Sequence, residues 1–197
     1  MNRKTALLVQ LGMMAALIAG AFLYPHELTA LLTARPRIYL HAKFLHVLTA
    51  TLFFGNVVIG TLWEARSLVA RRLDVIRHTY ETVAWLDAFF TAPLILIAVL
   101  TGVTLGTFLG GVFSMGWLTL AFGLFILSGV AWIAVDIPTQ ARVRRIFSEL
   151  APATHDVPRE LLRVLRLRLW LNLLAIVPLL IVLYLMVQKP DLSVFHR

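Results

Sequence analysis

The sequence predicts an all-α protein that crosses a membrane several times, and three observations support this fold class. Of its 197 residues, 60% are hydrophobic and only 14% are charged, and the mean hydropathy is +0.86. Such values lie outside the range of soluble globular domains. Five stretches each offer about 20 mostly apolar residues, the length that a helix needs to cross a bilayer core of roughly 30 Å. We therefore expect one polytopic transmembrane helical bundle over residues 1–197.

The five expected spans cover about residues 5–24, 38–63, 82–108, 112–135 and 166–187. Each stretch is continuously apolar, whereas the strands of a membrane barrel would be short and alternating. The last four are expected to form a compact four-helix core, with the first helix packed beside it. The first stretch also resembles a cleavable signal peptide, but its apolar run is longer than that of most signal peptides, which favours a retained helix.

The connections between the spans carry their own patterns. Residues 25–37 are expected to form a short amphipathic helix on the membrane surface, and residues 64–78 to form a basic interfacial helix. The fourth span is expected to end at Asp136 and Pro138. The basic segment 139–165 is then the longest loop.

Proline and glycine mark two positions in the third span. Pro93 lacks a backbone donor and is expected to kink the helix near Phe89. Gly102, Gly106 and Gly110 follow at intervals of four residues, which would place them on one face. Small residues at this spacing allow another helix to approach closely, so we expect them to serve helix packing.

Basic residues predict the orientation of the chain. Most of the 18 Lys and Arg residues lie at positions 3–4, 66–77 and 142–168, which share one side of a five-span arrangement. The positive-inside rule then places the N-terminus in the cytoplasm and the C-terminus outside, in a bacterial inner membrane. The formal net charge of +8 is expected to contact lipid headgroups, not nucleic acid.

Two polar layers are expected inside the bundle. Near the outer end of the second span, Lys43 and His46 are three residues apart and share a helix face, whereas His41 points away. Lys43 and His41 are expected to reach water at the outer surface. His46 lies deeper and is expected to face the bundle interior, next to the glycines of the third span.

The second polar layer lies toward the cytoplasmic end. It consists of Asn56, Asp87, Arg168 and Asn172. A charge inside the membrane costs roughly 3 kcal/mol or more, so Asp87 and Arg168 are expected to pair with each other. The layer either holds the helices together or forms part of a path for protons or ions.

The sequence predicts no catalytic residues. There is no cysteine, and the patterns of phosphate-binding loops, zinc proteases and serine hydrolases do not occur. Whether the protein is an enzyme is therefore left open.

Several strings carry a resemblance to a known family. The chain contains "HAKFLHVLTATLFFGNVVIGTLW", "WLDAFFTAPLILIAVLTG", "GWLTLAFGLFILSGVAWIAV" and "LIVLYLMVQKP". Together they resemble the DUF2269 family of integral membrane proteins over about residues 38–190. More distantly, Lys43 and His46 followed by Gly55 resemble the first core helix of the CopD-like proteins and of the HemJ protoporphyrinogen oxidases. This likeness implies a b-type haem ligated by His46, with its propionates near Lys43.

Three classes of function remain open. The first is a haem-binding or redox-linked membrane protein that uses His46. The second is a carrier for a small solute or a proton, and the third is a structural or accessory subunit, as a homo-oligomer or in a membrane complex. If no haem is bound, His46 is expected to bond to a backbone carbonyl near Pro93 or to a hydroxyl such as that of Thr101 or Thr104.

Overall fold

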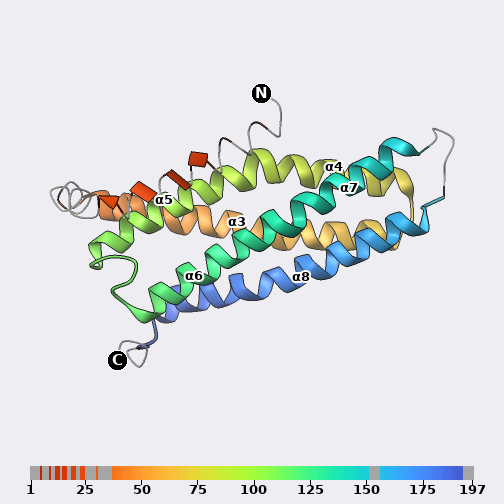
Figure 1. Cartoon of the computed structure of the whole chain (residues 1–197). Helices are drawn as coiled ribbons and strands as arrows, with labels where there is room; N and C mark the ends of the chain where they lie inside the picture. Colours follow the sequence, from red (N-terminus) through yellow and green to blue (C-terminus); the bar gives the residue numbers. More distant parts are fainter. Residues whose placement is uncertain are drawn as a thin grey trace.

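Four long helical rods lie side by side in the computed structural model of the chain (Figure 1). The structure describes residues 37–150 and 156–192, together with scattered positions between 5 and 30. Within these ranges it contains helices and turns but no strand. All four rods are long and apolar enough to cross a membrane. The expected first span, 5–24, and the expected surface helix, 25–37, lie largely outside the described residues.

Each rod is continuous, and two of them contain a π-helical turn. The first rod is α3 (Arg37–Ala70) and the fourth is α8 (Arg159–Gln188). The second consists of α4 (Leu73–Leu86), η1 (Asp87–Thr91) and α5 (Ala92–Phe108). The third consists of α6 (Gly116–Ala131), η2 (Trp132–Asp136) and α7 (Ile137–Glu149).

The rods extend beyond the expected spans. The expected interfacial helix 64–78 does not exist as one unit, because α3 continues to Ala70 and a tight turn with Arg71 at φ 50° leads directly into α4. The third rod likewise runs on to Glu149, where a loop was expected. The prediction that the fourth span ends at Asp136 and Pro138 is wrong. Proline is tolerated in the first turn of a helix, and α7 continues past it.

The two π-helical turns explain how the rods continue past their prolines. Each turn is closed by an N–H donated one residue before the proline, from Ala92 to the carbonyl of Asp87 and from Ile137 to that of Trp132. The wider turn accommodates the residue that cannot donate. The irregularity expected near Phe89 is thus a π-helical turn.

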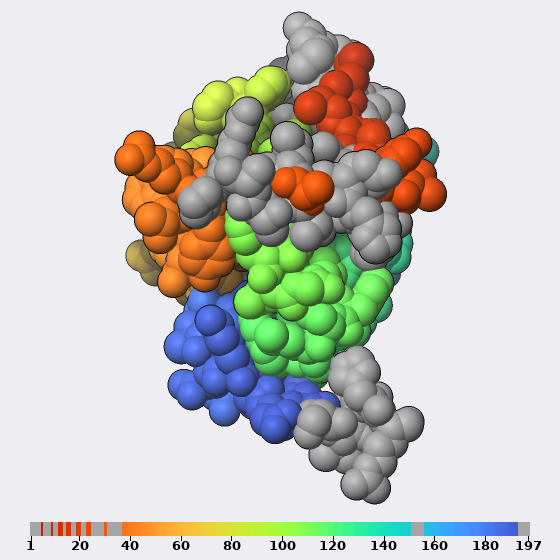
Figure 2. Space-filling model, turned by 90° about the vertical axis from the view of Figure 1, so that its left-hand side faces the viewer, coloured from red at the N-terminus to blue at the C-terminus, as the bar shows by residue number. Residues whose placement is uncertain are grey.

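The two ends of the bundle differ in charge. At the basic end, the α3–α4 turn and the α7–α8 connection bring together a group of arginines, which includes Arg66, Arg71, Arg72, Arg77, Arg142, Arg144, Arg145, Arg159, Arg163 and Arg166. The opposite end is called the glycine end here, after Gly110 and Gly111. The start of α3, the α5–α6 connection and the end of α8 meet there (Figure 2). The connection turns at Gly110 and Gly111, whose φ angles are 89° and 114°.

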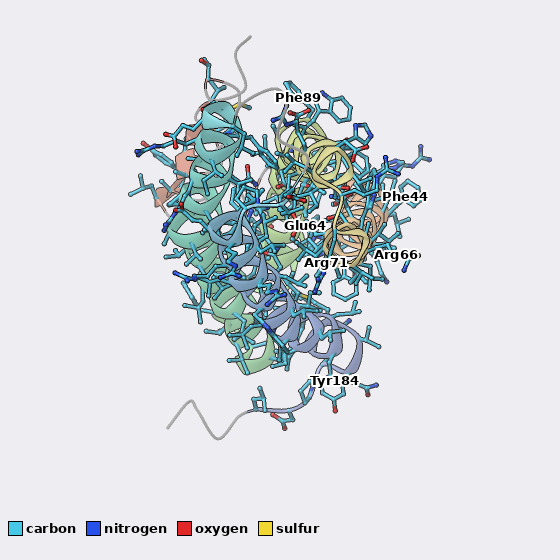
Figure 3. The ribbon with its side chains drawn as sticks, turned by 90° about the vertical axis from the view of Figure 1, so that its right-hand side faces the viewer. Phe44, Glu64, Arg66, Arg71, Phe89 and Tyr184 are labelled. Atoms are coloured by element: carbon cyan, nitrogen blue, oxygen red, sulfur yellow. The ribbon has the colours of Figure 1, made fainter. Side chains whose placement is uncertain are left out.

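The outer surface of the rods is apolar. α3 packs along α5, and α6 packs along α8, while α3 also contacts α4 and α8. Large side chains such as Phe44, Leu174 and Tyr184 are exposed, and Figure 3 shows Phe44 and Tyr184 at the periphery of the bundle. An apolar surface of this extent suits contact with lipid.

Candidate functional site: a charged layer beside an apolar cavity

A cavity of about 230 Å³ lies between the four rods. Toward the glycine end its walls are apolar and partly aromatic, with Phe53 from α3, Phe125 from α6 and Leu179 from α8. Toward the basic end each rod contributes polar side chains instead. The cavity is therefore an apolar space with a polar floor.

Arg168 occupies the centre of this floor. Its Nη2 atom lies 3.3 Å from Oε1 of Glu64 and 3.1 Å from Oδ1 of Asp136. The side chains of Arg168 and Glu64 are 3% and 1% exposed, and Figure 3 shows Glu64 between the helices, whereas Arg66 lies at the edge of the bundle. Three of the four rods thus meet in one buried ionic group.

Amide side chains extend this ionic group to the remaining rod. The Nε2 atom of Gln140 donates to Oδ2 of Asp87 at 2.9 Å and to Oδ2 of Asp136 at 2.8 Å. Asn172 Nδ2 donates to Oε2 of Glu64 at 3.0 Å. We call Glu64, Asp87, Asp136, Gln140 and Arg168 the charged layer. Beside it, Asn56 Nδ2 donates to Oγ1 of Thr91 at 2.8 Å.

Local structure explains why these side chains meet. Asp87 opens one π-helical turn and Asp136 closes the other, and such turns often occur at functional sites. Arg168 and Asn172 are four residues apart on α8 and share a face. On α3, Glu64 follows Asn56 by eight residues, about two helical turns, and so lies on the same face.

Several buried atoms of this region have no hydrogen-bond partner among the described residues. They are Oε1 of Glu64, Oδ1 of Asp136, Nε and Nη1 of Arg168, and the hydroxyl of Tyr80. The guanidinium of Arg168 lies 5.5 Å from the centre of the Tyr80 ring. Oε1 of Glu64 and Oδ1 of Asp136 are compensated by their ion pairs with Nη2 of Arg168. The other three atoms are buried polar groups of the kind that ordered water normally satisfies.

The charges of the layer do not balance. Three carboxyl groups, those of Glu64, Asp87 and Asp136, face the single guanidinium of Arg168. An uncompensated charge is costly inside a membrane protein, so protons or a bound cation must offset the excess. No group of three or more acidic, His or Cys side chains within the described ranges is arranged to hold a metal ion.

The structure brings together the residues of the expected inner layer, since Asn56, Asp87, Arg168 and Asn172 all line the cavity. The expected ion pair between Asp87 and Arg168 is wrong. Arg168 pairs with Glu64 and Asp136 instead, and Asp87 bonds to Gln140.

The sequence interpretation missed Glu64, Asp136 and Gln140. Glu64 was assigned to the expected interfacial helix, Asp136 to the end of the fourth span and Gln140 to the loop that was expected to follow it. One pattern could have found Glu64. Asn56, Gly60, Glu64 and Ser67 follow one another at intervals of four, four and three residues, which continues a single helix face beyond the apolar stretch.

The outer layer is arranged around His46. Its Nδ1 lies 2.9 Å from the carbonyl oxygen of Ala98 and 3.3 Å from Oγ1 of Thr101, so this nitrogen carries the proton and donates to α5. The ring lies against Gly102, where an added Cβ would come within 2.9 Å of its Cε1 atom. Lys43 is exposed, with its Nζ 6.0 Å from the Tyr39 ring centre, and His41 is exposed as well.

The three glycines do not form one packing face. Gly102 adjoins His46, but an added Cβ at Gly106 would meet Val112 of the following connection. Gly110 lies beyond the end of α5, in the turn. The expectation of a common glycine face is therefore wrong for Gly110.

The cavity between the rods is a poor fit for haem. The cavity between the rods is lined by no histidine, so a haem there would lack an imidazole ligand from the described residues. His46 itself is held against α5, and its ring fills the space beside Gly102. His46 and Lys43, the residues expected to hold a haem, thus lie outside the cavity between the rods.

Four long apolar rods with an apolar outer surface define a polytopic helical membrane protein. The chain belongs to the DUF2269 family of predicted integral membrane proteins, whose family model matches residues 40–190. Comparisons with curated proteins and with solved structures find no match. The more distant resemblance to the CopD-like and HemJ proteins stays a prediction.

Proposed function

We propose that the protein is a membrane carrier that binds a small, mostly apolar organic cation in the cavity between its rods. The observation that carries this proposal is the excess of carboxyl groups over guanidinium groups at the floor of an apolar cavity. Glu64, Asp87 and Asp136 supply the negative charge, and Arg168 offsets only part of it.

The walls of the cavity favour the same class of ligand. Phe53, Phe125 and Trp132 line it, and aromatic faces attract ammonium groups by roughly 0.5–2 kcal/mol. An apolar body would fill the space toward the glycine end while the positive group lies near the carboxylates. The apolar body of the ligand would thus exchange water for apolar walls, and its positive group would exchange water for carboxylates.

The position of the two π-helical turns suits a carrier. They lie within the second and third rods beside the cavity, and a proline follows each turn by two residues, at Pro93 and Pro138. Local π-helical turns often occur at functional sites, and such a turn can absorb a change in backbone angles when a transport protein alters the access to its site. We further propose that the basic end faces the cytoplasm of a bacterial cell, following the positive-inside rule.

Uptake into proteoliposomes tests the carrier function. The probe is radiolabelled benzyltrimethylammonium, a permanent cation with a small aromatic body. We expect saturable uptake by the wild-type protein and loss of uptake in the double variant Glu64→Gln, Asp136→Asn. Glu149→Gln, which changes an exposed carboxylate, is the matched control and should transport normally. Uptake no faster than in protein-free vesicles would refute the proposal.

Haem binding through His46 is a second candidate. One observation favours it, because an Nδ1–H bond to a carbonyl such as that of Ala98 orients many metal-bound imidazoles and leaves Nε2 available. An absorption spectrum of the purified protein decides between the candidates. A haem absorption band that the His46→Ala variant lacks would support haem binding through His46. A colourless protein that takes up no added haem would exclude it.

A further inference from the structure

A second cleft, of about 310 Å³, opens on the other side of the charged layer, toward the basic end. Tyr80 and Ala84 of α4 line it on one side, and Arg144 of α7 lies on the other. The exposed side chains of Arg77 and Glu81 stand at its border. Whereas the charged groups at the floor of the cavity are buried, Arg77, Glu81 and Arg144 at the border of this cleft are exposed.

The partition between the cleft and the cavity is thin. Arg168 lines both spaces. Gln140 lines the cleft, and it donates to Asp87 and Asp136, which line the cavity. The charged layer is therefore a partition about one side chain thick.

Unsatisfied polar atoms belong to the residues that line the cleft. They are the hydroxyl of Tyr80 and the Nε and Nη1 atoms of Arg168, in side chains of residues that are 5% and 2% exposed. Such buried donors are ordinarily solvated by ordered water. Water in the cleft would bring these donors, and through them the carboxyl groups of the layer, into contact with the aqueous phase at the basic end.

We propose that the charged layer is a proton-binding site that exchanges protons with the aqueous phase at the basic end through this cleft. A hydronium ion in the cleft transfers its proton to a carboxylate oxygen of Glu64, Asp87 or Asp136. One O–H bond of the hydronium ion breaks, one O–H bond of the neutral carboxyl group forms, and a water molecule remains in the cleft. Bound protons remove the excess negative charge whenever the cavity is empty of cations.

The groups that act on this equilibrium come from every rod. Glu64 lies on α3, Asp87 on η1, Asp136 on η2 and Arg168 on α8. Tyr80 adjoins Arg168 from α4. At the border of the cleft stand Arg77 and Glu81 of α4 and Arg144 of α7.

A cation in the cavity would compensate the same carboxylates, so its binding should release a proton. This coupling rests on the proposed function, whereas proton binding by the layer does not. The protein would then exchange an organic cation for a proton across the charged layer.

Infrared spectroscopy tests the proton site directly, because a protonated carboxyl group has its own carbonyl stretch. We expect this band at neutral pH in the wild-type protein and its loss or shift in at least one of the variants Glu64→Gln, Asp87→Asn and Asp136→Asn. Glu149→Gln, which changes an exposed carboxylate at the same end but outside the cleft, should leave the band unchanged. A wild-type spectrum without the band, or three layer variants that retain it unaltered, would overturn the proposal.

Cysteine labelling tests the route, since the chain has no cysteine of its own. Ala84→Cys places a thiol in the cleft, and Ile76→Cys places one in the apolar core of the same end. An impermeant thiol reagent should modify Ala84→Cys much faster than Ile76→Cys, and the modification should slow proton exchange by the layer. Equal labelling rates, or unchanged proton exchange after labelling, would contradict access through the cleft.

The coupling is measured by adding benzyltrimethylammonium to weakly buffered protein with a pH indicator. Proton release by the wild-type protein, and its absence in the double variant Glu64→Gln, Asp136→Asn, would support the exchange of an organic cation for a proton. Binding of the cation without proton release overturns the exchange and leaves the proposed function intact. If no cation binds but the infrared band behaves as expected, the proton site stands and the proposed function fails.

Discussion

Replacing Arg168 by methionine should destabilise the protein strongly, and more so as the pH rises. The residue is 2% exposed, and its Nη2 lies 3.3 and 3.1 Å from two carboxylates. Removing one partner of a buried ion pair costs about 3–5 kcal/mol, because the other partner keeps its uncompensated charge. Loss of the contact with the Tyr80 ring adds about 0.5–1 kcal/mol.

The pH dependence follows from the carboxyl groups left behind. In Arg168→Met, folding is easiest when Glu64, Asp87 and Asp136 all carry protons, whereas the same groups ionise freely in the unfolded chain. The folded variant therefore binds more protons than the unfolded variant, and its free energy of unfolding falls as the pH rises. At mildly acidic pH the loss relative to the wild type should be smaller.

Unfolding in detergent at mildly acidic and mildly alkaline pH measures this effect. Arg166→Met, which changes an exposed arginine of the same helix, is the control and should be close to the wild type. Adding Glu64→Gln and Asp136→Asn to Arg168→Met should recover much of the lost stability. A variant as stable as the wild type at alkaline pH, or equally destabilised at both pH values, would refute the reasoning.

Three further predictions concern other parts of the bundle. Gln140→Leu leaves two carboxylates without their donor and should cost about 1–3 kcal/mol in thermal unfolding; wild-type stability would contradict the bridging role. Gly102→Ala forces the His46 ring to move and should cost about 1–3 kcal/mol, whereas Gly123→Ala, with nothing near its Cβ, should be neutral or stabilising. Cysteines at Ala70 and Ser114 should label from opposite sides of the membrane, and labelling of Ala70→Cys in intact cells would overturn the orientation.

The rods were predictable from the sequence because their apolar stretches alone determine them. Their ends were not, and Glu64 and Asp136 show why. A hydropathy pattern treats a charged residue as the edge of a span, but here Arg168 compensates both carboxylates, so the helices continue through them. Pro138 likewise led to a fourth span that was predicted too short, because the π-helical turn before this proline lets the third rod continue.

The pairing within the charged layer could not be derived from spacing. A π-helical turn adds one residue to a rod, which rotates the following face by about 100° relative to a regular helix. Two such turns, at Asp87–Thr91 and Trp132–Asp136, decide which acid meets Arg168. Spacing did place Asn56, Asp87, Arg168 and Asn172 at one depth, since depth depends only on the rise per residue.

The contact of His46 was foreseen only as a choice between ligand and core residue. In the structure His46 bonds to the carbonyl of Ala98 and to the hydroxyl of Thr101, and Thr101 is one of the two hydroxyl partners that the sequence predicts for a His46 without haem. The choice of Ala98 among neighbouring carbonyls depends on how α3 and α5 rotate against each other at Gly102, which the sequence pattern does not specify.

The claim that the cavity selects a small organic cation is tested most directly by equilibrium binding of two molecules of equal shape. Benzyltrimethylammonium carries a permanent positive charge, and neopentylbenzene is its uncharged isostere. We predict that the purified protein prefers the cation, and that Glu64→Gln with Asp136→Asn weakens this preference by about tenfold or more, roughly 1.4 kcal/mol. Equal affinity for the two molecules, or a preference that the double variant leaves unchanged, would contradict the account.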